Sequence, residues 1–146
     1  MSPGSITDTY VAALQHDLVD LDDDTQLVGV VRRPTRWFNP QVDENFTALA
    51  PPEDLFTEFQ DRRDDLEAEG HAEAAAHNQA WTDVDYDRRY RAHLETDPAA
   101  QAAVDELLGR VNTGATIALV CYENTEDKRC HRTALRTYLE GQLDQR

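Results

Sequence analysis

Two runs of apolar residues stand out in a chain that is otherwise rich in polar side chains. Residues 27–31 (LVGVV) and 116–121 (TIALVC) are continuous apolar runs rather than alternating ones. Strands that are buried on both faces of a parallel sheet have this pattern. We therefore predict one buried strand in each run, and a loop over 32–40 after the first.

The N-terminal stretch 6–21 fits two kinds of element. Tyr10, Leu14 and Leu18 have the spacing of one helical face. Ile6 and Tyr10, with a threonine between them, also suit the start of a strand. Periodicity alone leaves both interpretations open.

The region between the two strand candidates has the periodicity of helices. Gly70 and Gly114 mark the ends of two helices, and Asp97 followed by a proline opens another. A last helix is predicted to begin near Lys128. The predicted helices cover 53–70, 71–81, 86–94, 98–113 and the residues from 128 onward.

Strand and helix candidates alternate at both ends of the chain, and 146 residues suit one hydrophobic core. The sequence contains no repeat, low-complexity tract or linker. We therefore predict a single domain over residues 1–146 of the α/β class, with a small, mostly parallel sheet flanked by helices.

The charge composition predicts an acid-coated surface. Aspartate and glutamate total 29 against 14 basic residues, which gives a formal net charge of −15, and 13 of the basic residues are arginine. The acids are spread between apolar stripes, so a folded protein is predicted rather than a disordered tail. Such charge is typical of haloarchaeal proteins, which stay soluble in concentrated salt. The alternative is an ordinary acidic protein from a moderate environment.

High salt changes which contacts can bind a ligand. At about 1 M salt the screening length is roughly 3 Å, so long-range steering of anions is lost. Short bidentate contacts from arginine then serve better than contacts from lysine.

Neither a membrane span nor a secretory leader is apparent in the sequence. No apolar run is long enough to cross a membrane, and the N-terminus MSPGSITDTY lacks the form of a signal peptide. Two cysteines do not make a disulfide framework. We expect a cytoplasmic protein with reduced thiols and no membrane partner.

Basic residues follow both strand candidates. Carboxyl ends of neighbouring parallel strands meet at one edge of a sheet, where α/β proteins bind ligands, and a helix N-terminus there also favours anions. We predict a site for a small phosphorylated ligand, bound by Arg32 and Arg132, whereas Arg129 and Arg136 are predicted to neutralise nearby carboxylates. The two basic segments contain Arg32, Arg33 and Arg36, and Lys128, Arg129, Arg132 and Arg136.

Cys130 falls in the first turn of the predicted last helix, beside His131 and Arg132. A thiol in such a place is favoured as a thiolate and can act as a nucleophile, with His131 carrying the proton. Adjacent helical residues point about 100° apart, so His131 need not face the thiol. The alternative is a buried structural cysteine, which is also the expectation for Cys121.

Other chemistries for the same segment stay open. Glu123 can serve as a general base at the mouth of the loop, or as a cap or salt-bridge partner of Arg132. Cys121 and Cys130 can form a redox pair, although eight residues separate them. This spacing is a weak match to zinc sites, so no metal or other cofactor is predicted.

The segment LVCYENTEDKRCHRTALRTYL resembles the signature of the DUF488 family. That signature is an apolar strand, then C-Y/A-E, a short loop, and C-H-R leading into the last helix. The segments VVRRPTRWF, ALAPPEDLF and YDRRYRAHL resemble further family segments. TDTYVAAL resembles the family's N-terminal Thr-x-Tyr strand, which favours a strand over the first part of 6–21.

The resemblance spans nearly the whole chain and implies a fold and a site, but no reaction, because the family is uncharacterised. Many members have an aspartate before the first arginine, and Val31 stands at that position here. The residues that the resemblance singles out are Arg32, Pro34, Trp37, Cys121, Glu123, Cys130, His131 and Arg132.

The leading hypothesis is a small enzyme with a pocket for phosphate or a nucleotide and a catalytic cluster of Cys130, His131 and Glu123. Trp37 and Tyr90 are candidate ligand-binding residues beside the arginines. The alternatives are a non-catalytic module that binds such a ligand or a nucleic-acid end, and a redox-responsive protein. Extended nucleic-acid binding is not expected, because it needs a broad basic surface. The sequence does not indicate the substrate or the oligomeric state.

Overall fold

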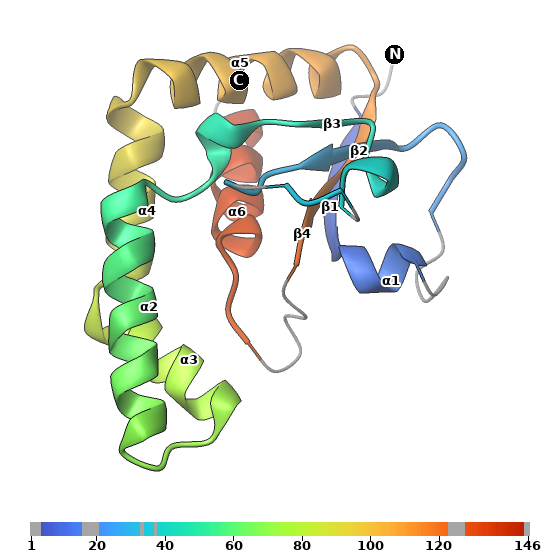
Figure 1. Cartoon of the computed structure of the whole chain (residues 1–146). Coiled ribbons are helices and arrows are strands. Elements are labelled where there is room, and N and C mark those ends of the chain that lie inside the picture. Colours follow the sequence, from blue (N-terminus) through green and yellow to red (C-terminus); the bar gives the residue numbers. More distant parts are fainter. Residues whose placement is uncertain (1–3, 16–20, 33, 37, 123–127, 145–146) are drawn as a thin grey trace.

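The structure is a computed structural model, and it describes residues 4–15, 21–32, 34–36, 38–122 and 128–144. In this part of the chain, four strands form one parallel sheet in the order β1-β4-β2-β3 (Figure 1). The strands are β1 (Ser5–Tyr10), β2 (Gln26–Gly29), β3 (Glu44–Asn45) and β4 (Thr116–Cys121).

The most apolar strand, β4, lies between β1 and β2. Every residue of β4 from Ile117 to Cys121 is buried, as a strand covered on both faces requires. The parallel pairing sets Gly29 of β2 opposite Val120 of β4. The predicted α/β class with a parallel sheet is therefore confirmed.

The N-terminal stretch contains both of the elements that its pattern allowed. Strand β1 pairs with β4 along its whole length, so the strand favoured by the family resemblance is confirmed. A short helix, α1 (Val11–Gln15), follows directly.

Strand β2 is shorter than predicted, because a side chain replaces its strand partner after Gly29. The amide group of Asn45 accepts a hydrogen bond from Val31 N at 3.1 Å and donates one to Val31 O at 3.0 Å. A Cβ atom at position 29 would lie 2.6 Å from Asn45 Oδ1 and from the Phe38 ring, so this close approach requires glycine. The chain can thus leave the sheet at Val31 with its backbone groups paired.

The predicted helices are present, and their ends follow local rules. The Asp97 side chain caps its helix by accepting from Ala100 N at 2.9 Å. Gly70 and Gly114 have φ angles of 103° and 104°, a region that favours glycine, and each follows the end of a helix. The helices are α2 (Glu53–Ala68), α3 (Glu73–Asp83), α4 (Tyr86–Thr96), α5 (Pro98–Asn112) and α6 (His131–Asp144).

Two features differ from the sequence-based prediction. Helix α6 begins at His131 and not near Lys128, so Cys130 precedes the helix instead of lying in its first turn. The short strand β3 and the 3-10 turns η1 (Asn39–Gln41) and η2 (Thr47–Leu49) lie in a region for which no element was predicted.

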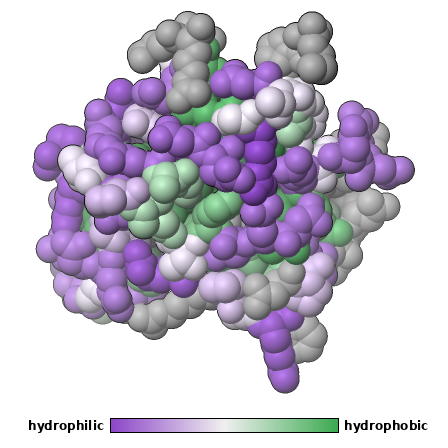
Figure 2. All heavy atoms as spheres, turned by 90° about the horizontal axis from the view of Figure 1, so that it is seen from above, coloured by the Kyte–Doolittle hydropathy of each residue, from purple (hydrophilic) through white to green (hydrophobic). Residues whose placement is uncertain are grey.

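Helix α6 packs against β1 and β4, and α4 and α5 pack against α6 (Figure 1). Helices α2, α3 and α4 contact one another at one side of the sheet, and we call them the helical arm. Seen from the α5 side, hydrophilic residues cover most of the surface (Figure 2). Among the described residues, no helix has the length and apolar character needed to cross a membrane.

Candidate functional site

A cavity of about 390 Å³ opens at the carboxyl end of β4, where the sheet meets the helical arm. Both cysteines line it, together with His131, three arginines and several aromatic side chains. We call it the arginine cavity. It lies at the edge of the sheet where ligands bind in parallel α/β folds.

Cys130 and His131 meet at the base of this cavity. The Cys130 sulfur lies 3.7 Å from His131 Nδ1, and His131 Nε2 lies 2.5 Å from the carbonyl oxygen of Val30. A carbonyl only accepts, so Nε2 carries the proton of the neutral ring. Burial lowers the pKa of His131, which favours this neutral form and leaves the lone pair of Nδ1 directed at the thiol.

The late start of α6 explains why these adjacent side chains can meet. Two neighbouring residues within a helix diverge by about 100°. Cys130 lies outside the helix and His131 is its first residue. The backbone between them therefore need not follow helical geometry, and the thiol can face the imidazole.

Arg132 lies beneath the thiols. Its side chain is only 1% exposed, and Nη1 donates to the Cys121 sulfur at 2.9 Å. Its Nε pairs with Asp8 of β1 at 3.1 Å, and Arg136 also pairs with Asp8, at 3.0 Å. The structure thus places Arg132 as a support for the thiols and not, as expected, as an arm that extends towards a ligand.

The two cysteine side chains lie close enough for Cys130 to contribute to the raised pKa of Cys121. Burial raises the pKa of Cys121 well above its usual value, so this thiol keeps its proton. The simplest set of donors then runs in one direction: Arg132 to Cys121, Cys121 to Cys130, Cys130 to His131, and His131 to the Val30 carbonyl. In this arrangement Cys121 can donate to the Cys130 sulfur when Cys130 loses its proton.

Two guanidinium groups at the cavity lack a carboxylate partner among the described residues. Arg32 donates to the carbonyl of Pro51 through Nε at 2.9 Å and Nη2 at 2.6 Å, and Arg129 donates to Thr82 Oγ1 at 3.3 Å. Arginines elsewhere in the fold do pair with carboxylates, for example Arg62 with Asp83 at 2.8 Å. Arginines without a carboxylate partner among the described residues are unexpected in a chain with a net charge of −15.

Among the described residues no carboxylate pairs with Arg129, so its predicted neutralisation stays a prediction, while Arg136 pairs with Asp8. Helix α3 holds the backbone of Arg129 in place. His77 Nε2 lies 2.7 Å from Arg129 O, and Asn78 Oδ1 accepts from Arg129 N at 3.0 Å. The helical arm therefore fixes the segment that leads into Cys130.

Aromatic side chains of the helical arm form the opposite wall of the cavity. Trp81 and Tyr86 stack with ring centroids 3.7 Å apart, and Phe59 meets both rings edge-on. Arg63 lies over the Phe59 ring and lines the cavity as the third arginine. Sequence analysis missed this wall, because only the docking of the arm brings it to the sheet.

The remaining predicted residues have different outcomes. Tyr90 is fully buried, donates to the carbonyl of Leu49 and meets the His131 ring edge-on at 5.5 Å, so it packs beneath the site. Glu123 and Trp37 lie outside the described residues, so their predicted roles stay predictions. Within the described ranges, no three His, Cys, Asp or Glu side chains gather in a way that could hold a metal ion.

A comparison with protein families returns one match that covers nearly the whole fold. The model described as "Active DUF488-N3 subclade" matches residues 10–143, from the end of β1 to the end of α6. The chain belongs to the DUF488 family. No curated protein and no solved structure matches it. For this DUF488 chain, function must therefore be inferred from the site itself.

Proposed function

We propose that this DUF488 protein is a small thiol-dependent enzyme that binds a phosphorylated molecule, such as a nucleotide, in the arginine cavity. One observation carries the proposal: a thiol–imidazole pair lies at the base of a cavity that Arg32 and Arg129 also line. A thiol, a base and cations that lie beside them are the groups that nucleophilic catalysis on an anionic substrate needs. The aromatic wall suits a flat ring, as in a nucleobase.

In the proposed reaction, Cys130 is the nucleophile and His131 the base. The pair is neutral at rest, so the thiol proton moves to His131 Nδ1 as the sulfur attacks. A bond forms between the Cys130 sulfur and an electrophilic atom of the substrate, and the bond to the leaving group breaks. The imidazolium then returns its proton to the leaving group, and water releases the product from the sulfur.

Cys121 and Arg132 are positioning residues in this scheme. The Cys121 thiol donates to the Cys130 sulfur as negative charge develops there, and Arg132 orients Cys121 by donating to it. The N-terminus of α6, directly after Cys130, adds a partial positive charge nearby. These groups offset the cost of forming a thiolate in a buried place.

The test is the rate at which iodoacetamide alkylates Cys130, measured by peptide mass mapping in molar KCl. Inorganic phosphate should slow the alkylation of Cys130 in the wild type, because it fills the space between the thiol and the arginines. Arg32→Gln should raise the phosphate concentration needed for half-protection by about tenfold, the loss of about 1.4 kcal/mol of binding. Cys130→Ser should abolish turnover once a substrate is found.

Arg62→Gln is the matched control, because Arg62 pairs with Asp83 outside the cavity. Phosphate should protect Cys130 in this variant at the same concentration as in the wild type. Absence of phosphate protection in the wild type would overturn the proposed function. Binding that survives in Cys130→Ser, with no turnover in the wild type on any phosphorylated compound tested, would instead favour a non-catalytic module for a small ligand or a nucleic-acid end.

The closeness of the two thiols, which both line the arginine cavity, favours a second candidate, a redox-responsive protein. With a peroxide as oxidant, the Cys130 thiol would become a sulfenic acid and release one water. The Cys121 thiol would then condense with it, forming a disulfide and a second water. Blocking of both cysteines by hydrogen peroxide, reversed by dithiothreitol and unaffected by phosphate, would favour this function over the enzyme.

A further inference from the structure

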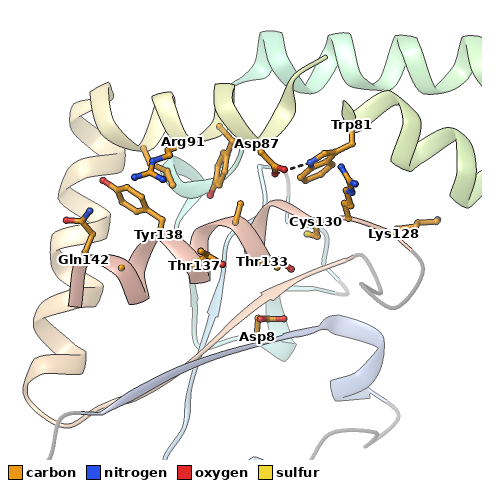
Figure 3. Close-up of a pocket in the computed structure, with 15 residues that line it drawn as sticks. Asp8, Trp81, Asp87, Arg91, Lys128, Cys130, Thr133, Thr137, Tyr138 and Gln142 are labelled. Atoms are coloured by element: carbon orange, nitrogen blue, oxygen red, sulfur yellow. Dashed lines mark hydrogen bonds between the residues drawn. The ribbon is translucent and has the colours of Figure 1, made fainter. Parts of the chain in front are cut away.

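A second cavity, of about 880 Å³, runs along α6 between that helix and α4 (Figure 3). We call it the α6 groove. Trp81, Arg129 and Cys130 line both this groove and the arginine cavity. The two spaces therefore meet at the proposed nucleophile, and a single ligand can occupy both.

The groove offers a different chemistry from the arginine cavity. Thr133 and Thr137 are exposed, with hydroxyl groups spaced one helical turn apart, and Gln142 adds an amide at the far end (Figure 3). These side chains are uncharged donors and acceptors. They suit the hydroxyl groups of a sugar or the edges of a base better than a second phosphate.

Apart from Arg129, which the groove shares with the arginine cavity, the charged side chains at the groove have partners, and Lys128 pairs with Glu73. Asp8 pairs with Arg132 and Arg136, and Asp87 accepts from Trp81 Nε1 at 3.0 Å, as the dashed line in Figure 3 marks. At the far end, Arg91 pairs with Glu95 at 3.4 Å and lies over the Tyr138 ring. The stretch of α6 along Thr133 and Thr137 therefore presents uncharged groups to the groove, in contrast to Arg32 and Arg129 at the neighbouring cavity.

We infer that the substrate has two parts: a phosphate held at Arg32 and Arg129, and an uncharged, hydroxyl-bearing part of nucleoside size that lies in the α6 groove. This inference rests on the proposed function. The reacting bond then lies between the two parts, beside Cys130. A volume of about 880 Å³ is ample for a nucleoside, since pockets for drug-sized ligands span about 300–1,000 Å³.

Gly141 allows a direct test, because it lines the groove one turn beyond Thr137 and an added Cβ would meet nothing within 4 Å. Gly141→Phe should narrow the groove without disturbing the core. Gly109 of α5 is the matched control: it is also an exposed helical glycine with open space around it, and it lies at neither cavity. Thermal melting should show both variants folded.

The measurement is again protection of Cys130 from iodoacetamide, with inorganic phosphate compared with the common ribonucleoside 5′-monophosphates. At least one nucleotide should protect the wild type at a concentration at least about tenfold lower than phosphate, a gain of about 1.4 kcal/mol. Gly141→Phe should remove that advantage and leave phosphate protection unchanged, and Gly109→Phe should change neither. Thr137→Trp, on the same face of α6, is a second blocking variant.

Two outcomes would overturn the inference, and they differ in what they leave standing. If phosphate protects the wild type but nucleotides protect no better, or if both groove variants keep the nucleotide advantage, the two-part substrate is wrong and the proposed function stands. If neither phosphate nor any nucleotide protects the wild type, the proposed function falls and the inference falls with it.

Discussion

Burial sets the protonation state of the residues at the base of the arginine cavity. His131 is 9% exposed and Cys121 only 1%, and burial acts on them in opposite directions on the pH scale. It lowers the pKa of His131 and raises that of Cys121, and both changes favour the neutral form. At rest His131 and Cys121 are therefore neutral, and Arg132 is the fixed cation beside them.

This protonation state predicts how stability depends on pH. The unfolded chain binds a proton at position 131 near pH 6.5, whereas the folded protein resists it, so the unfolded state binds more protons below that pH. The stability associated with neutral His131 is fully present above pH 6.5 and falls as the pH drops towards the lowered pKa. The slope can reach about 1.4 kcal/mol per pH unit.

The measurement is chemical denaturation of the wild type and of His131→Gln between pH 5 and 8. Glutamine does not titrate, and its amide can still donate to the Val30 carbonyl. The contributions of the other histidines to the pH dependence of stability cancel in this comparison, because both proteins contain them. The wild type should lose stability relative to the variant as the pH falls, and parallel curves would contradict a buried, neutral His131.

At the scale of elements, the site forms where three separate parts of the fold meet. The segment after β2 brings Arg32, the end of β4 and the start of α6 bring the thiols, and the helical arm brings the aromatic wall. Asn45 of β3 helps to fix this arrangement, because its side-chain amide forms hydrogen bonds with both backbone groups of Val31. Arg32 is the residue directly after Val31, so these hydrogen bonds also fix where the Arg32 side chain starts.

Asn45→Ala should therefore weaken the site as well as the fold. It leaves the amide and the carbonyl of Val31 without their partner, at a cost of about 1–3 kcal/mol. The Tm should fall. Half-protection of Cys130 should also need a higher phosphate concentration, because the backbone next to Arg32 is no longer held in place. Asn45→Asp keeps an acceptor for Val31 N, so its Tm and its phosphate requirement should lie between those of the wild type and of Asn45→Ala. An unchanged phosphate requirement in Asn45→Ala would show that Arg32 is held by Pro51 alone.

The elements that sequence analysis predicted are those with a local signal. The continuous apolar runs marked β2 and β4, and Asp97, Gly70 and Gly114 marked helix ends. Strand β3 was missed because two residues carry no periodicity. The support from Asp8 to Arg132 was missed because 124 positions separate the two residues, and no local pattern reports such a contact.

At the scale of the whole molecule, charge is the dominant property. The 29 acidic side chains outnumber the basic ones by about two to one, and the surface in Figure 2 is mostly hydrophilic. Their mutual repulsion opposes the compact state in dilute solution. Salt screens that repulsion over a few ångströms, whereas the short arginine contacts inside the fold are less affected.

We therefore expect the Tm to rise steeply between dilute buffer and molar KCl. Differential scanning calorimetry across this range measures the effect. Sorbitol is the control, since it favours compact states without screening charge. A flat profile in KCl, or an equal rise in sorbitol, would contradict adaptation to high salt.

The order of the strands determines when the sheet can form during synthesis on the ribosome. Strands β1 and β2 do not pair with each other; each pairs with β4, which is synthesised more than eighty residues after β2. Throughout synthesis of the helical arm and α5, β1 therefore lacks its strand partner, and β2 has only the two-residue strand β3 beside it. The sheet and the thiol pair can assemble only when residues 116–131 have left the exit tunnel. Until then the nascent chain holds Arg32 but no nucleophile, so no partly made form of the protein can carry the proposed chemistry.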